Sequence, residues 1–226
     1  MSLFACVTLP GMWADVPSYF IIQSNARNTA MALPSCSYVG ALLHDRMHHA
    51  GGSVVCTGVG SIASFTNVKF HACTLVVHDG AQVTLRTPLF ADMVAAAASL
   101  SIFVHGEGTT VHVERGSIEG GTQGVAVQAG ARLEASGLDV TKMNLTGLHV
   151  KGKGSHLSLT ACKVHDLLPC PLEDYLSDGV LVQAGGSAQL KNCYMSACGS
   201  GVIARHEGSR LEADGCTFEK LSLIHI

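Results

Sequence analysis

Charged and aromatic residues are scarce in this 226-residue chain, at 14% and 5%. The formal net charge of −3 gives no electrostatic basis for binding nucleic acid or an anionic membrane surface. No run of about 18 apolar residues occurs, so the sequence predicts no membrane-spanning helix. The 47% of hydrophobic residues and the 25 glycines are typical instead of short buried strands joined by tight turns, and they argue against disorder.

Signals for export and for metal binding are also missing. The first residues carry no basic segment ahead of a long apolar run, which argues against a signal peptide. The nine cysteines lack the CxxC spacing that is typical of zinc sites. We therefore predict no metal site. The compartment stays open: these features favour the cytoplasm, and a truncated N-terminus would allow secretion.

One strand-and-turn pattern recurs seven times from about residue 60 onward. Each copy reads apolar-x-apolar-x-x-small-x-apolar, and the copies lie 20 to 31 residues apart. The copies end at Phe70, Phe90, Ile118, Val140, Val164, Met195 and Phe218. Alternation with period two indicates strands with one face inward, whereas amphipathic helices place apolar residues three and four apart. Repeats of this length with variable insertions are typical of solenoids.

A third apolar segment precedes these two strands in most copies, for example Gly124–Val127 and Gly179–Val182. Three strands per coil, stacked about 4.8 Å apart, predict a triangular prism with parallel sheets on its sides. Parallel crossover connections are almost always right-handed. The predicted fold is therefore all-β, a right-handed single-stranded parallel β-helix of about seven coils over residues 52–220.

The two ends of the chain depart from the repeat. Residues 1–51 are expected to form an irregular or helical N-terminal cap, with a short helix over 39–49 that covers the end of the solenoid. That helix would place His44 and His48 on one face, but no third zinc ligand is identifiable. Residues 221–226 are interpreted as a non-native tail, and the chain is expected to be a fragment of a larger protein.

The repeat resembles the right-handed β-helix of the pectin-lyase-like superfamily over roughly residues 52–220. The likeness lies in coils that open with Gly-Val-Leu-Val or Gly-Val-Ala-Val and close with Cys-x-apolar. The resemblance implies the fold, but that superfamily includes polysaccharide lyases, hydrolases and epimerases, phage tailspikes and non-catalytic modules. The paired-Asp, Gly-His-Gly and Arg-x-Lys signatures of polygalacturonase-like enzymes are missing from the sequence, as is the Asp-Pro-His-Asp signature of uronate epimerases.

The first strand of each coil is unusual because its outward positions are mostly apolar. This apolar row consists of Val76, Phe103, Ala126, His149, Leu181 and Ile203. A basic line runs beside it, formed by His78, His105, Gln128, Lys151, Gln183 and Arg205. Either the N-terminal segment or a loop covers the apolar row, or the row binds a partner protein or glycan. The basic line is either a solvated turn edge or a site for an anionic chain such as a uronate.

Two insertions follow the third strand: residues 91–99, predicted as a short helix, and an acidic loop at 165–178. The loop offers groups for acid/base chemistry or for calcium, namely His165, Asp166, Glu173, Asp174 and Asp178. Thr146 and Ser200 stack on Asp178, so its corner of the coil supplies no second carboxylate. Three cysteines, Cys162, Cys193 and Cys216, share one inward position and are predicted to be buried packing thiols.

These observations predict a non-catalytic β-helix scaffold or binding module that presents a flat strand face to a protein or a glycan, without a cofactor. The alternative is a polysaccharide-active enzyme, of the pectate or uronate lyase or glycoside hydrolase type, which would use the basic line and the acidic loop, with calcium as its cofactor. A third reading is a structural protein that associates end to end.

Overall fold

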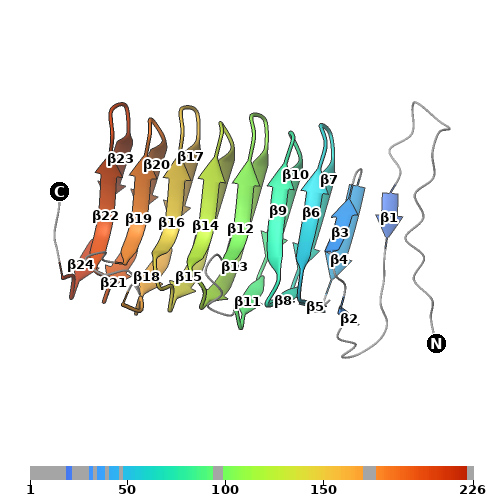
Figure 1. Ribbon diagram of the computed structural model, residues 1–226, viewed down its shortest axis with the longest axis horizontal. Coiled ribbons are helices and arrows are strands. Elements are labelled where there is room, and N and C mark those ends of the chain that lie inside the picture. The colour runs from blue at the N-terminus through green and yellow to red at the C-terminus, as the bar shows by residue number, and fades with distance from the viewer. Residues whose placement is uncertain are drawn as a thin grey trace.

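The chain folds as a right-handed parallel β-helix of about seven coils, as the repeat predicts (Figure 1). The computed structural model describes residues 48–93, 99–169 and 177–222, together with four short strands at 19–21, 31–32, 35–38 and 41–45. Every pair of neighbouring strands is parallel, and the described residues contain no helix.

The first strand of each coil belongs to an eight-stranded sheet, which we call sheet B. Its strands are β3 (Ser35–Tyr38), β6 (Ser53–Thr57), β9 (Thr74–His78), β12 (Leu100–His105), β14 (Gln123–Gln128), β16 (Thr146–Lys151), β19 (Asp178–Gln183) and β22 (Ser200–Arg205). The strands stack in register, so each residue of one coil lies over its counterpart in the next.

The second and third strands form a sixteen-stranded sheet, which we call sheet A. The second strands are β1 (Tyr19–Ile21), β4 (Ala41–Asp45), β7 (Ile62–Thr66), β10 (Gln82–Arg86), β13 (Thr110–Glu119), β15 (Arg132–Thr141), β17 (His156–Thr160), β20 (Ser187–Lys191) and β23 (Arg210–Asp214). The third strands are β2 (Met31–Ala32), β5 (His48–Ala50), β8 (Lys69–His71), β11 (Leu89–Ala91), β18 (Lys163–His165), β21 (Tyr194–Ser196) and β24 (Thr217–Glu219). The long strands β13 and β15 run through both positions.

The bend between the second and third strands has one residue with left-handed backbone geometry in each coil from β7 to β24. These residues have φ between 48° and 63° and are Asn67, Thr87, Arg115, Gly137, Ala161, Asn192 and Gly215. Glycine and asparagine adopt this geometry readily, whereas alanine and β-branched residues do so at a cost. The corner is therefore imposed by the stacking of the coils and not by local preference alone.

The core consists of rows of identical inward positions along the solenoid axis. His49, Phe70 and Phe90 stack one above another, with ring centroids 5.4 and 4.4 Å apart. Cys162 and Cys193 are buried in a neighbouring row, which confirms that these two thiols pack in the core. The third member, Cys216, is only partly buried because it lies in the last described coil.

Glycine opens the first strand because adjacent coils approach closely there. A Cβ atom on Gly147 would lie 2.6 Å from the carbonyl oxygen of Gly179 and 2.7 Å from Cγ1 of Val164. A Cβ atom on Gly124 would likewise lie 2.6 Å from the carbonyl oxygen of Gly147. The Gly-Val-Leu-Val openings in the sequence are therefore a steric requirement of the stacked coils.

The helix predicted over 39–49 is wrong, because β4 and β5 lie in this segment. Leu42 pairs with Ala63, and His49 pairs with Phe70. Another coil of strands satisfies the exposed edge of β7 and β8, which an isolated helix would leave unpaired. His44 and His48 consequently lie on two different strands and share no helix face. Residues 94–98, on which the other predicted helix depends, lie outside the described residues.

Candidate binding face

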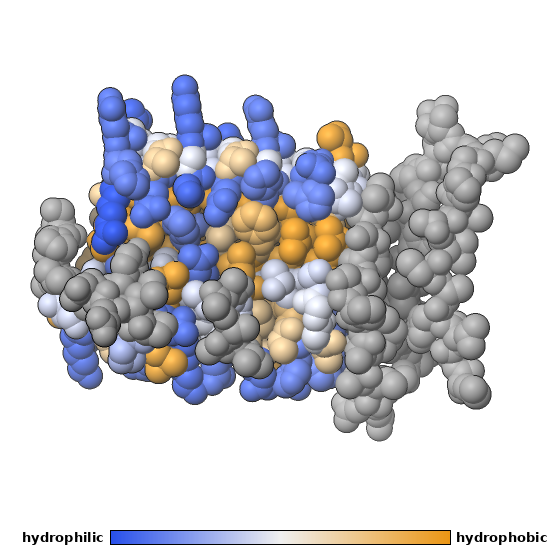
Figure 2. All heavy atoms as spheres, in the orientation of Figure 1, coloured by the Kyte–Doolittle hydropathy of each residue, from blue (hydrophilic) through white to orange (hydrophobic). Residues whose placement is uncertain are grey.

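Sheet B aligns the predicted apolar row along the solenoid axis in the expected register. Val55 extends the row by one coil, because it pairs with Val76. The row divides into two parts: Ala126, Leu181 and Ile203 are buried, whereas Val55, Val76, Phe103 and His149 are half-buried. Figure 2 shows hydrophobic atoms gathered over the middle of this face. The accessible apolar strip is therefore the part around Phe103.

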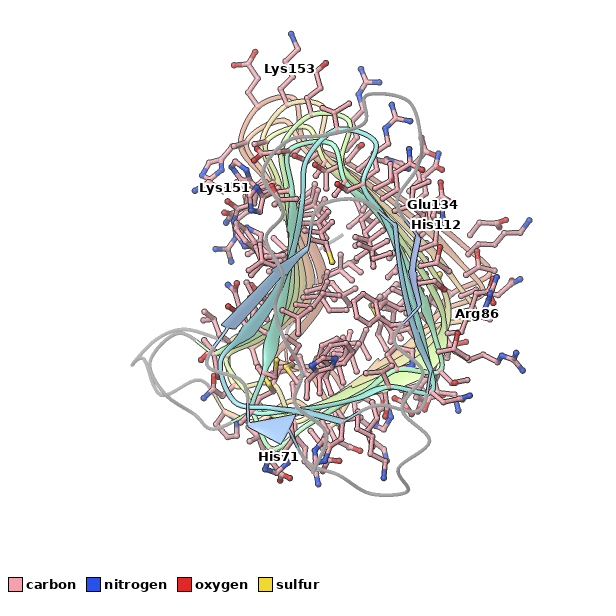
Figure 3. All side chains as sticks on the ribbon, turned by 90° about the vertical axis from the view of Figure 1, so that its right-hand side faces the viewer. His71, Arg86, His112, Glu134, Lys151 and Lys153 are labelled. Atoms are coloured by element: carbon pink, nitrogen blue, oxygen red, sulfur yellow. The ribbon has the colours of Figure 1, made fainter. Side chains whose placement is uncertain are left out.

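The basic line lies beside the apolar row, at the end of each strand of sheet B. His105, Lys151 and Arg205 are exposed, whereas His78 is half-buried and its Nδ1 lies 2.7 Å from Asp79. Gln128 and Gln183 separate the three exposed residues and are half-buried. Lys151 projects outward from the sheet B side of the coil (Figure 3).

The turns that follow sheet B alternate in length, a feature that the sequence interpretation missed. Four residues separate β6 from β7, β12 from β13, β16 from β17 and β22 from β23, whereas three residues separate the strands of the intervening coils. Figure 1 shows the resulting alternation of taller and shorter loops along one edge. The sequence signal is a Gly-x-Gly-Ser/Thr motif, as in Gly106–Thr109, that alternates with Ala-Gly-Ala or a similar triplet, as in Ala129–Ala131.

A hydroxyl group at the end of each long turn fixes the turn in place. The Thr109 hydroxyl donates to the carbonyl oxygen of His105 at 2.9 Å and accepts from the amide of Gly80, also at 2.9 Å. Ser155 does the same, donating to Lys151 O at 2.8 Å and accepting from Gly130 N at 3.0 Å. The hydroxyl thus holds the backbone of the basic residue that ends the strand and ties the long turn to the preceding short turn.

The protruding long turns leave hollows between them. One hollow, with a volume of about 590 Å³, lies above the short turn Ala129–Gly130 and between the turns that carry Glu107 and Lys153. Arg132 also lines it. Lys153 points away from the corner of the coil, whereas Lys151 points from the sheet B side (Figure 3). Lys153, in the middle of its long turn, therefore lies at the corner and not on the face of sheet B.

The structure does not bring the predicted acid/base residues together. His165 lies on the outer surface, where Nε2 is 2.9 Å from Asp139 and Nδ1 is 2.8 Å from Asp166. Asp178 faces the interior and is only 1% exposed. The other two predicted residues, Glu173 and Asp174, lie outside the described residues.

Asp178 is a buried carboxylate without a hydrogen-bond partner on either oxygen. It lies between Thr146, whose hydroxyl is also buried without a partner, and Ser200. Burial raises the pKa of Asp178 to about 6, against smaller opposing effects of the Arg205 charge and the Ser200 hydroxyl. The surroundings of Asp178 therefore favour its neutral form.

Within residues 48–93, 99–169 and 177–222, no three histidine, cysteine, aspartate or glutamate side chains are arranged to hold a metal ion. No helix in the described part of the chain is long and apolar enough to cross a membrane.

Comparisons with protein families, curated proteins and solved structures gave no match to this chain. The strand order and pairing define its class, which is that of the right-handed parallel β-helix proteins.

Proposed function

We propose that the chain is a non-catalytic β-helix scaffold that binds an extended partner along the outer face of sheet B. One observation carries the proposal: the half-buried Val55, Val76 and Phe103 form an apolar strip that His149 continues, and the exposed His105 and Lys151 flank its Phe103 and His149 positions. An apolar centre bordered by charged groups is the usual anatomy of a protein-binding surface.

The three-strand coils and their Gly-Val-Leu-Val openings support a relationship of this β-helix to the pectin-lyase-like superfamily. That relationship concerns the fold only, because members with one fold carry many activities. The proposed binding role depends instead on the side chains of sheet B.

The proposal is tested by probing peptide and glycan arrays with the full chain and with two variants. Phe103→Asp introduces a charge into the apolar strip, and Thr84→Asp introduces the same charge at an outward position of β10 in sheet A. We expect Phe103→Asp to lose a signal that Thr84→Asp retains, with thermal unfolding of both variants close to that of the parent. A signal that both variants retain in full would overturn the proposal.

A polysaccharide-active enzyme is the second candidate, and one observation favours it. Asp139 and His165 converge from adjacent coils, with Asp166 on the second nitrogen of the imidazole. A carboxylate beside a histidine can act in general acid/base catalysis. Uronate-chain cleavage by the parent, abolished by His165→Gln and by Asp139→Asn, would establish this activity; turnover that both variants retain would exclude this site.

A further inference from the structure

The exposed basic residues of the basic line lie on every second coil from β12 to β22. His105, Lys151 and Arg205 end β12, β16 and β22, each of which leads into a four-residue turn. The two coils between them, β14 and β19, end in the neutral residues Gln128 and Gln183 and lead into three-residue turns. From β12 to β22 the long turns and the exposed basic residues therefore follow the same two-coil period, whereas the half-buried His78 ends β9 ahead of a short turn and Thr57 ends β6 ahead of a long one.

The two-coil period sets the distance between successive exposed basic residues. Neighbouring strands of a sheet lie about 4.8 Å apart, so every second strand is about 9.6 Å away. The hydroxyl groups of Thr109, Ser155 and Ser209 each bond to the carbonyl oxygen of the cationic residue in their own turn, at 2.9, 2.8 and 2.6 Å. The three backbone positions are thus held in a regular line about 19 Å long.

Among extended chains, a polyproline II helix matches this spacing best. It has three residues per turn and rises about 3.1 Å per residue, so side chains at every third position lie about 9.3 Å apart. Over two intervals the mismatch with the protein is only about 0.6 Å. Same-face residues of a β-strand repeat at about 6.8 Å and miss by about 3 Å at the first step. In an α-helix, residues seven apart are about 10.5 Å from each other, and the error reaches about 2 Å over two intervals.

We propose that the basic line binds an acidic polyproline II segment of a partner protein that carries a carboxylate at every third residue. The inference rests on the proposed binding role of sheet B and names the chemistry of its partner. Carboxylates of the segment lie against His105, Lys151 and Arg205, and the residues between them face the half-buried Phe103 and His149 of the apolar row. A polyproline II ligand is already extended before it binds, so little conformational entropy is lost.

Two of the three long turns beside the basic line carry a glutamate. Glu107 and Glu207 occupy the second position of their long turns, as Lys153 does in the turn between them. Lys153 points away from the corner, in a different direction from Lys151 (Figure 3). The ligand lies on the sheet B side, along the row of strand ends.

The test compares two labelled twelve-residue peptides of identical composition by fluorescence anisotropy with the full chain at about 50 mM salt, where exposed charges are weakly screened. The first peptide is (Glu-Pro-Pro)₄, which has a carboxylate at every third residue. The second is (Glu-Glu-Pro-Pro-Pro-Pro)₂, which breaks that period. We expect the first peptide to bind at least threefold more tightly than the second.

Variants test whether the period of the cations matters. Lys151→Gln and Arg205→Gln should each weaken binding of (Glu-Pro-Pro)₄ about two- to fivefold, as expected for exposed ion pairs. Lys191→Gln removes an exposed charge from sheet A and should leave binding unchanged. The double variant Gln128→Lys with Lys151→Gln keeps the net charge but moves one cation by one coil, and it should abolish the preference between the two peptides.

Equal binding of the two peptides, or a preference that survives in the double variant, would overturn the inference. Failure of both peptides to bind, or binding of a uronate oligosaccharide in their place, would overturn it as well. The proposed function is judged separately, because loss of an array signal in Phe103→Asp but not in Thr84→Asp does not depend on the period of the cations.

Discussion

Replacing Asp178 by asparagine should stabilise the protein at neutral pH. The carboxylate is 1% exposed and has no hydrogen-bond partner, and burial raises its pKa from 3.8 to about 6. A shift of about two pKa units corresponds to about 3 kcal/mol between the two protonation states. Because the folded state binds this proton more tightly than the unfolded state, the stability of the parent falls as the pH rises from about 4 to about 6.

The asparagine variant does not ionise, so its stability should not fall between pH 4 and pH 6 for this reason. We expect its free energy of unfolding to equal that of the parent near pH 4 and to exceed it by about 2–3 kcal/mol above pH 7. Urea unfolding at intervals from pH 4 to pH 8 measures the difference directly. The control variant Asp139→Asn removes a surface hydrogen bond to His165 and should not stabilise the protein at any pH. A difference in stability between Asp178→Asn and the parent that does not change with pH would show that ionisation of Asp178 does not destabilise the folded state.

Three further substitutions test the packing of the coils by chemical denaturation. Gly147→Ala should lower the free energy of unfolding by about 3 kcal/mol, because the new Cβ would lie 2.6 Å from a backbone oxygen. Unchanged stability would show that the coils can separate there. Ala161→Gly should raise the free energy of unfolding by about 1 kcal/mol, because glycine adopts the φ of 52° at this position without strain. A lower free energy of unfolding would contradict this explanation of the bend. Burial and the charge of His48 lower the pKa of His49 from 6.5 to about 4, so stability is complete above pH 6.5 and falls by about 3 kcal/mol as the pH drops toward 4. His49→Leu should abolish that part of the acid loss, and an unchanged profile would contradict the assignment.

The register of the solenoid was predictable because each strand position stacks on its counterpart in the next coil. Aligning the repeats placed Val76 beside Phe103 and His105 beside Gln128, and the pairing confirms both. The alternating turn lengths were also predictable from the Gly-x-Gly-Ser/Thr motifs, but these motifs recur on every second coil, so the pattern of a single coil does not show them.

Other features depend on contacts with neighbouring coils, which the sequence of a single segment does not reveal. The Ala-Leu-Leu-His-Asp stretch at 41–45 contains good helix formers, yet the free edges of β7 and β8 make it a strand. The burial of Leu181 and the exposure of Phe103 do not follow from their equivalent places in the repeat. The acidic loop suggested a surface site, but Asp178 opens β19 with the same inward parity as Val180 and is buried.

Whether the outer face of sheet B is the binding surface can be decided by comparing three proteins. The measurement is the affinity of the parent, Phe103→Asp and Thr84→Asp for a ligand identified on the arrays. We expect Phe103→Asp to lose affinity tenfold or more, since a charge buried in the interface lacks a partner, and Thr84→Asp to keep the parental affinity. Equal affinity of all three proteins would contradict the claim and place the binding surface elsewhere on the solenoid.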